Sequence, residues 1–370
     1  MMMALDRRSI LKASALAGGG LLLPSCASLP KTRGLSTVCT PLPPVKVDAG
    51  RVIRTVAGLR PYRDSGFVVR RDQLGDKTLV HNYGHGGAGI TLSWGSSRIA
   101  ADLGLPGHSG PVAVIGAGVM GLTTARLVQE AGFPVTLYAA ALPPDTTSNL
   151  AGGNWGPYGH YKKERVTPEW NAQFAAALEY SWRRFQIMVG EDYGVRWLPT
   201  YSEGGYAGPH PLDPYFPGTR WLDPSQHPFP IGKAGVYETM YVETGRFLRE
   251  LTKDVQIGGG TIQVRKFATP ADLLGLRERL VFNCTGLGSR ELFGDTDLRP
   301  ARGQLAILLP QPEVRYAFTG DGIYMFPRPD GILLGGTFEL DQWSTVPEPA
   351  AIERILAKHK ALFDGLRCTA

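Results

Sequence analysis

Apolar residues form short runs separated by polar turns along most of the chain, which predicts alternating strands and helices. The clearest case is an apolar run at Val112–Ile115, an amphipathic stretch at 122–130 and a second apolar run at 135–138. The two short runs predict buried strands, and the amphipathic stretch predicts a helix that Gly132 ends. The segment 111–139 therefore predicts a βαβ unit with parallel strands.

The second half of the chain shows different patterns. Thr167 and Pro168 mark a helix start, and apolar residues then recur at helical spacing at Trp170, Phe174, Leu178, Phe185 and Met188. Segments 237–242 and 263–266, with a hairpin around Pro329-Asp330-Gly331, predict an antiparallel sheet. A last helix is predicted at 350–363.

The N-terminus has the pattern of an export signal. Arg7 and Arg8 precede an uncharged run at 13–23 that is too short for a permanent membrane span. The arginine pair resembles a twin-arginine signal, which predicts export of folded protein to the periplasm. Residues 1–27 are expected to be this signal, and 28–47 a linker. Cys26 lies in a possible lipoprotein cleavage box, so both a lipid-anchored form and a soluble form cleaved after Ala27 are open.

Composition excludes several classes of protein. A hydrophobic fraction of 43% suits a packed core, and a net charge of +6, scattered along the chain, does not indicate nucleic acid binding. Four cysteines at this spacing predict neither a disulfide framework nor a CxxC metal site. His81 and His85 lie among glycines rather than on a helix, so no metal site is expected.

Two glycine turns carry the candidate chemistry. Gly116, Gly118 and Gly121 form GxGxxG between the predicted strand and helix, a pattern that cradles the pyrophosphate of a dinucleotide. The acidic residue expected after the second strand is missing, which argues against a plain NAD site. A second turn, "HNYGHGGAG", precedes the first one and also indicates close approach of backbone to a ligand.

These residues resemble the FAD-dependent D-amino acid oxidase family. The resemblance is carried by "GLRPYR", "HNYGHGGAG", "TTSNLAGGNWGP", "VFNCTGLGS", "RPARGQ" and "YMFPRPDGILLGGTFE". It implies an α/β protein in which an FAD-binding Rossmann-like domain carries an antiparallel-sheet substrate domain. In the family the first two motifs follow the dinucleotide turn, whereas here they precede it, so the chain order resembles a circular permutation. Its ends, near Arg51 and Phe363, are then expected to be neighbours.

The resemblance also divides the chain. Segment 48–110 is expected to be the permuted part, 111–157 the FAD-binding βαβ unit, and 158–370 mainly the substrate domain, with a return to the FAD domain around 262–306. The residues expected to bind FAD are Gly116, Gly118, Gly121, Thr146, Thr147, Ser148, Gly152, Phe267, Gly286, Gly86, Gly89, Ile90 and Thr91.

The implied reaction is oxidation of an amino acid at Cα, with hydride passing to the flavin and dioxygen reoxidising it. By match to the family, Arg60 holds the substrate carboxylate, Tyr324 closes over it, and the Gly87 carbonyl accepts from the amine. Phe338 stands where some members have a second tyrosine, so one hydroxyl is missing.

Three functions are consistent with these features. The first is an exported oxidase that converts D-amino acids and dioxygen to 2-oxo acids, ammonia and hydrogen peroxide. The second is a flavin-dependent amine or amino acid dehydrogenase with another electron acceptor. The third is a flavoprotein without catalysis. The preferred side chain and the oligomeric state do not follow from the sequence.

Overall fold

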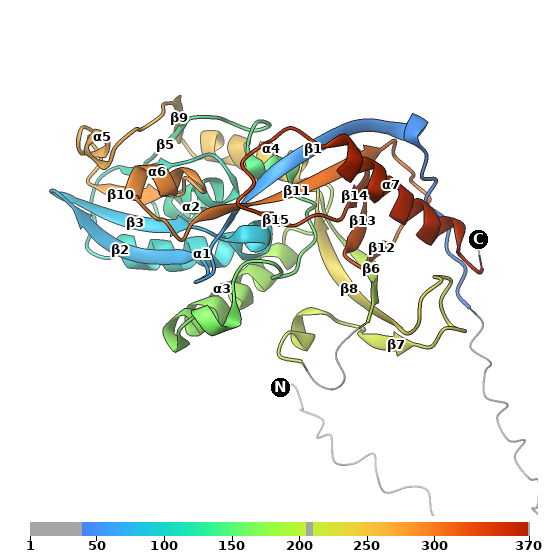
Figure 1. The fold of residues 1–370 in the computed structure, drawn as a ribbon. Helices are drawn as coiled ribbons and strands as arrows, with labels where there is room; N and C mark the ends of the chain where they lie inside the picture. The colour runs from blue at the N-terminus through green and yellow to red at the C-terminus, as the bar shows by residue number, and fades with distance from the viewer. Residues whose placement is uncertain (1–38, 205–209, 369–370) are drawn as a thin grey trace, which may run out of the picture. The chain divides into compact units, whose positions relative to one another are not determined.

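The computed structural model describes residues 39–204 and 210–368. The predicted signal 1–27, with Arg7, Arg8 and Cys26, lies outside the described residues. Within these residues the strands form two sheets (Figure 1). No helix of the described part is long and apolar enough to cross a membrane.

The first sheet contains the predicted βαβ unit. Its order is β2 (Val68–Leu74), β3 (Lys77–Tyr83), β10 (Leu280–Asn283), β4 (Val112–Ile115), β5 (Val135–Ala139) and β9 (Thr261–Val264). All neighbours are parallel except β2 and β3. Buried apolar residues cover both faces of this sheet, as a parallel sheet requires.

Helices on the two faces of the first sheet close its core. One face packs against α1 (Gly89–Gly104) and α2 (Val119–Glu130), with α4 (Thr244–Ile257) beside α2; the other lies near α5 (Pro270–Leu274) and α6 (Gly288–Phe293). Next to α1 lies α3 (Pro168–Gln186), where the Thr167 side chain accepts from the Trp170 N–H at 3.2 Å. The sequence prediction of this helix start is confirmed.

The second sheet is mostly antiparallel. Its order is β1 (Val52–Tyr62), β11 (Arg299–Leu308), β14 (Gly331–Gly335), β13 (Ile323–Arg328), β12 (Ala317–Gly320), β6 (Val195–Glu203), β8 (Ala234–Val242) and β7 (Arg220–Leu222), with β15 (Glu339–Leu340) paired to β11. Among the described strand pairs of this second sheet, only β12 and β6 run parallel to each other. One face packs against α7 (Pro349–Asp364), and the other faces the first sheet's helices and the cavity described below.

The observed α/β architecture agrees with the fold class predicted from the sequence, and 237–242 and the hairpin around Pro329 lie in the antiparallel sheet. The prediction for 263–266 was wrong. Residues 263 and 264 are the end of β9, which is the edge strand of the first sheet. Residues 265 and 266 lie beyond the end of this strand. Four residues that are mostly exposed carry no pattern that could tell one sheet from the other.

The two ends of the described body lie side by side. Cys39 and Cys368 form a disulfide, 329 positions apart in sequence. Val45 and Val47 share a buried cluster with Phe363 of α7, and the Tyr316 hydroxyl donates to the Pro43 carbonyl at 2.8 Å. In Figure 1 the blue strand β1 lies against the orange strand β11, to which it pairs along its length.

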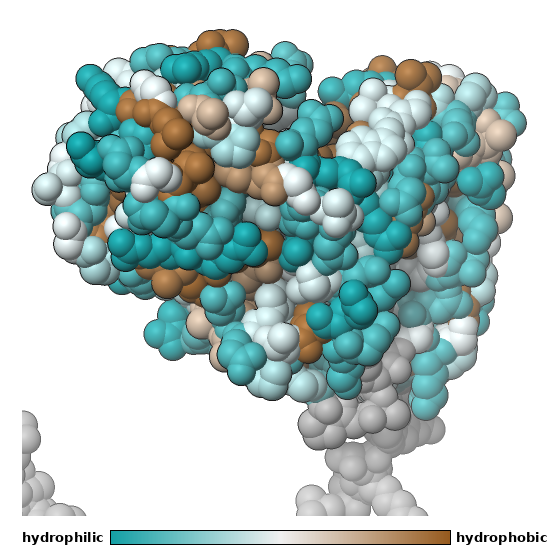
Figure 2. Space-filling view, turned by 60° about the vertical axis from the view of Figure 1, so that its left-hand side comes forward, coloured by the Kyte–Doolittle hydropathy of each residue, from teal (hydrophilic) through white to brown (hydrophobic). Residues whose placement is uncertain are grey.

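These contacts correct two expectations. The cysteine spacing predicted no disulfide framework, because spacing along the chain says nothing about ends that fold back on each other. Residues 42–47, placed by the sequence in a linker, are packed on the second sheet. The face of the molecule shown in Figure 2 is mainly hydrophilic, with hydrophobic residues in small groups.

Candidate active site

A cavity of about 1380 Å³ lies between the two sheets, and both glycine turns line it. That volume exceeds the range of about 300 to 1,000 Å³ that is usual for drug-sized ligands, so it has room for a dinucleotide together with a second, smaller molecule. The two turns therefore line one ligand site, as the family resemblance implies.

The first turn joins β4 to α2 and leaves no room for side chains. Gly116 has a φ of +112°, and a Cβ there would lie 2.4 Å from the Cys284 carbonyl oxygen. A Cβ at Gly121 would lie 1.8 Å from the Gly116 carbonyl oxygen. The Ser148 hydroxyl accepts from the Val119 N–H at 3.0 Å at the start of α2. Backbone can therefore approach a pyrophosphate closely at the positive end of this helix.

The second turn follows β3 and leads through a short 3-10 helix, Gly86–Ala88, into α1. Gly86 has a φ of +51°, and the Gly87 N–H donates to the Gly159 carbonyl at 2.9 Å. A Cβ at Gly87 would lie 2.8 Å from the Tyr158 carbonyl oxygen. This turn is thus held against a loop that follows it by about seventy positions, rather than by its own helix.

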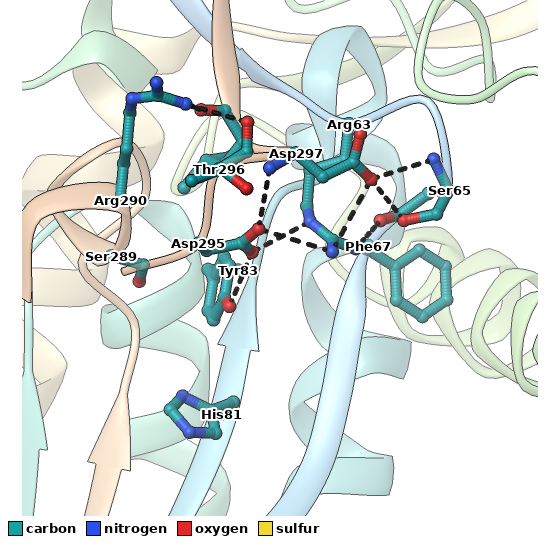
Figure 3. A network of polar contacts seen from close by, with 12 residues as sticks. Arg63, Ser65, Phe67, His81, Tyr83, Ser289, Arg290, Asp295, Thr296 and Asp297 are labelled. Atoms are coloured by element: carbon teal, nitrogen blue, oxygen red, sulfur yellow. Dashed lines mark hydrogen bonds and ion pairs between the residues drawn. The ribbon is translucent and has the colours of Figure 1, made fainter. Parts of the chain in front are cut away.

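A half-buried polar network anchors the second turn to the β10–β11 connection (Figure 3). The Arg63 guanidinium donates to Asp295 at 2.9 Å, and the Tyr83 hydroxyl donates to the same carboxylate at 2.8 Å. Ser65 donates to Asp297 beside this pair. Burial alone would raise the pKa of Asp295, but the bonds from Tyr83 and Arg63 outweigh burial and lower it. The network keeps Tyr83 and the turn that follows it in place.

The two histidines near the turn have separate structural roles. Burial lowers the pKa of His81 to about 4, and its ring bonds with Asn283 at 2.9 Å and lies 3.2 Å from Asp72. Burial also lowers the pKa of His85 to about 3, and its Nε2 bonds with Ser96 at 2.8 Å. Both are neutral at pH 7. The described residues contain no group of three His, Cys, Asp or Glu side chains suited to a metal ion.

Arg60 and Tyr324 meet beside the second turn, where a Cβ at Gly87 would lie 3.8 Å from the Arg60 side chain. Arg60 lies on β1 and donates to the Tyr324 hydroxyl of β13 and to the Ala301 carbonyl, each at 3.4 Å. These long bonds leave the guanidinium available to a bidentate anion. Phe338 lies at the edge of the pair: it is 49% exposed, and the Arg60 guanidinium carbon is 5.8 Å from its ring centre.

Two further glycines make room for this pair, and the sequence analysis missed them. A Cβ at Gly303 would lie 2.3 Å from an Arg60 guanidinium nitrogen, and a Cβ at Gly335 would lie 2.1 Å from the Tyr324 ring. Gly303 is paired with Gly58 in the β1–β11 ladder. The signal in the sequence was a glycine inside a strand, which marks close approach of another group.

Nearly all the predicted site residues line the one cavity. They are Arg60, Gly86, Gly87, Gly89, Ile90, Gly116, Gly118, Thr146, Thr147, Ser148, Gly152, Phe267, Gly286 and Tyr324. Gly121 and Thr91 do not line it. Gly121 lies behind Gly116, and the Thr91 hydroxyl accepts from the Gly156 N–H at 2.9 Å and donates to the Gly156 carbonyl at 3.0 Å. Both residues shape the cavity wall from behind, and their contact with FAD stays a prediction.

The residues present fit an FAD molecule. A Cβ at Gly116 would collide with the Cys284 carbonyl, so only glycine lets the turn lie this close to the end of β10, where Thr285 and Gly286 line the same cavity. Where an NAD site would have an acidic residue after β5, the wall consists of Ala139, Ala140 and Ala141. Fold and site together define a dinucleotide-binding flavoprotein.

Comparison with known proteins places the chain in a family. A family model described as "FAD dependent oxidoreductase" (DAO) matches residues 33–103 and 111–370. A D-amino-acid oxidase of Streptomyces coelicolor is 33% identical over 275 residues, 69% of this chain and 78% of that protein. One of Rubrobacter xylanophilus is 31% identical over 268 residues, 69% and 77% of the two chains. The chain belongs to the DAO family, so it is an FAD-dependent oxidoreductase.

A solved structure agrees on the fold. Glycine oxidase from Bacillus cereus has a TM-score of 0.51 at 16% identity, covering 69% of this chain and 78% of that one. At this identity the likeness concerns the fold alone.

Proposed function

We propose that the protein is an exported oxidase that deaminates D-amino acids to 2-oxo acids and ammonia, with dioxygen as electron acceptor and hydrogen peroxide as product. The observation that carries the proposal is the Arg60–Tyr324 pair, which lies beside the Gly87 turn in the wall of the flavin cavity. Related D-amino-acid oxidases, about one third identical to this chain, support the substrate class.

In this proposal each residue of the pair has a defined task. Arg60 binds the substrate carboxylate with two parallel hydrogen bonds, which its planar guanidinium allows and a lysine would not. Tyr324 adds a hydroxyl donor to the same carboxylate. The Gly87 carbonyl accepts from the substrate amine, which arrives neutral, so no general base is required. With the carboxylate and the amine held by these two contacts, the Cα–H bond would face the flavin in only one of the two enantiomers, which sets the chirality of the substrate.

Bound FAD supplies the electron sink for the two electrons removed from the substrate. The chain contributes positioning and a largely apolar wall that includes Ile90, Leu305 and Phe326. A drier site strengthens the charged contact to Arg60, because fewer waters compete for it.

The test is an absorption spectrum of the purified holoenzyme under anaerobic conditions before and after D-alanine. The proposal predicts bleaching of the flavin band by D-alanine but not by L-alanine, and peroxide on readmission of air. Bleaching without peroxide, but with turnover on an artificial dye, would instead favour the flavin-dependent dehydrogenase. An exported protein could pass its electrons to an acceptor in the membrane. No bleaching by any amino acid would favour the flavoprotein without catalysis.

Export by the twin-arginine route is part of the proposal. The Cys39–Cys368 disulfide supports it, because such bonds persist in oxidising compartments. An Arg7→Lys, Arg8→Lys double variant is expected to remain in the cytoplasm. In exported protein, Cys39 and Cys368 should resist alkylation until a reductant is added, whereas normal export of the double variant would contradict the proposal.

We also propose that the chain is circularly permuted relative to its family. The family model matches in two pieces that meet in the exposed loop between α1 and β4. The two ends of the body are joined by a disulfide whose Cα atoms are 6.5 Å apart. Both features are those of a chain whose original ends lay near 104–110 and whose new ends adjoin each other.

A further inference from the structure

The antiparallel sheet extends the cavity well beyond the Arg60–Tyr324 pair. Tyr324 of β13 is paired with Thr319 of β12, and Thr319 with Ser202 of β6. Ser202 is paired in turn with Gly235 of β8, and Gly235 with Trp221 of β7. All five residues line the cavity. Paired residues project from the same face of a sheet, so these five form one row, here called the cross-strand row.

The length of the cross-strand row follows from strand spacing. Neighbouring strands lie about 4.8 Å apart, so the row spans roughly 14 Å from Tyr324 to Gly235. A substrate with the carboxylate on Arg60 and a methyl side chain would cover only the first part of it. Such a substrate would make no contact with the rest of the row, which ends at Gly235 and Trp221.

Gly235 determines how the far end of the row is built. A Cβ at this position would lie 2.7 Å from the Ser202 hydroxyl and 3.0 Å from the Trp221 ring. The absence of a side chain therefore brings an indole over the strand, next to a hydroxyl. Trp221 remains 42% exposed, so part of its ring is open to another group in the cavity.

Other aromatic rings enclose the same end. Phe216 packs against Tyr237 with ring centres 5.0 Å apart and stacks on Tyr158 at 6.2 Å. All three line the cavity, and Tyr237 projects from the same face of β8 as Gly235, two positions further on. The far end is thus an aromatic enclosure, suited to a flat apolar group.

The cross-strand row itself carries no charge, since its members are Tyr, Thr, Ser, Gly and Trp. Glu203 follows Ser202 and so projects to the opposite face of β6, and it lines the cavity outside the row. Asp213 accepts from the His210 backbone N–H at 2.7 Å, which commits it to a turn. None of the five residues of the row itself therefore offers a charge to an acidic or basic side chain, although the carboxylates of Glu203 and Asp213 line the cavity beside it.

We infer that the substrates preferred at this site are D-amino acids with a long side chain ending in an aromatic or flat apolar group, bound along the cross-strand row with that group on Trp221. The inference rests on the proposed function, because it takes the substrate carboxylate to lie on Arg60. Burial of an aromatic group is expected to be worth tenfold or more in affinity, by an order-of-magnitude estimate.

The first test compares kcat/KM for D-alanine, D-aspartate, D-phenylalanine, D-tryptophan and Nε-benzoyl-D-lysine. We expect the aromatic substrates to exceed D-alanine and D-aspartate by roughly tenfold or more. Trp221→Ala and Gly235→Val should reduce this preference to about twofold or less at unchanged flavin content. Trp343→Ala, a control at a 50% exposed tryptophan outside the cavity, should retain it.

A preference for D-alanine or D-aspartate, or an aromatic preference that survives both Trp221→Ala and Gly235→Val, would overturn the inference and leave the proposed function standing. A second measurement decides the matter even if no D-amino acid reduces the flavin. Calorimetric titration of the holoenzyme should give a Kd for indole-3-butyrate at least about tenfold below that for butyrate, and Trp221→Ala should abolish the difference. Equal values in the parent protein would refute the cross-strand row as a binding site.

Discussion

The two glycine turns face one cavity but are built in different ways. The turn at Gly116 is local: the residues that crowd it, Gly121 and Cys284, belong to its own βαβ unit and the adjacent strand. The turn at Gly86 and Gly87 is held from a distance, by Gly159 and by the Arg63–Asp295 network. The spacing of GxGxxG indicates the contacts within its own βαβ unit, whereas the glycines of "HNYGHGGAG" do not reveal the remote residues that hold the second turn.

The difference also separates their tasks. The first turn offers backbone N–H groups at a helix start, where any dinucleotide pyrophosphate can bind. The second turn also lies against Arg60, so its exact position matters to a substrate as well as to the cofactor. Damage to the first turn should therefore abolish cofactor binding, and damage on the Arg60 side should spare it.

The largest effect is expected for Gly116→Val. Gly116 has a φ of +112°, and a Cβ here would lie 2.4 Å from the Cys284 carbonyl oxygen. Any side chain at this position would therefore displace the turn. Purified protein should lack FAD, as measured by absorbance and by release on denaturation. The matched control is Gly232→Val, because a Cβ at Gly232 would meet no atom within 4 Å. Retention of full FAD by Gly116→Val would show that the cofactor lies elsewhere.

Arg60→Leu should have the next largest effect. Loss of a charged bidentate partner is expected to cost about 2 to 5 kcal/mol, or roughly thirty- to several-thousand-fold in kcat/KM. FAD content should remain that of the parent, which distinguishes this variant from Gly116→Val. Arg54→Leu, at an exposed arginine of the same strand, is the control. An Arg60→Leu enzyme as efficient as the parent would exclude the carboxylate role.

The difference between the turns also explains what the sequence could predict. GxGxxG and the flanking apolar runs predicted β4, α2 and β5 to within a few residues, because periodicity and turn chemistry are local. The roles of Arg60 and Tyr324 came only from the family resemblance. The residues next to Arg60 in the sequence do not reveal a partner that lies 264 positions away. Gly303 and Gly235 were missed for the same reason: their neighbours come from other strands.

The second turn should also make the protein sensitive to acid. His81 and His85 have pKa values lowered to about 4 and about 3 in the folded state, below about 6.5 in the unfolded chain. As pH falls below 6.5 the unfolded state takes up protons first, so the free energy of unfolding declines. At pH 5 the loss is of order 2 kcal/mol per histidine.

Denaturant titration of the parent and of His85→Gln at pH 7 and pH 5 measures this effect. The glutamine amide can keep a hydrogen bond to Ser96 but does not titrate, so this variant should lose less stability between the two pH values. Lys358→Gln, at an exposed helix position, should behave like the parent. An equal pH dependence in parent and His85→Gln would show that His85 is not buried as a neutral ring.

The smallest effect is expected from a change of chain order. A chain that starts at Pro111, runs to Cys368, continues through a linker of about three residues to Cys39 and ends at His108 would restore the order of the family. The 6.5 Å between the Cα atoms of the two cysteines is within reach of such a linker, since each residue spans at most about 3.6 Å. Both turns and all contacts of the cavity would be conserved, because the new ends lie in the exposed loop after α1. FAD content should equal that of the parent and kcat/KM should agree within about twofold.

The control for this reordered chain has the same linker but is opened between Gly303 and Gln304, inside β11. It should not fold, since the break divides the strand that β1 and β14 share. If the chain opened at the loop also failed to fold, the second turn would depend on the present order of the segments, and the permutation proposal would be withdrawn.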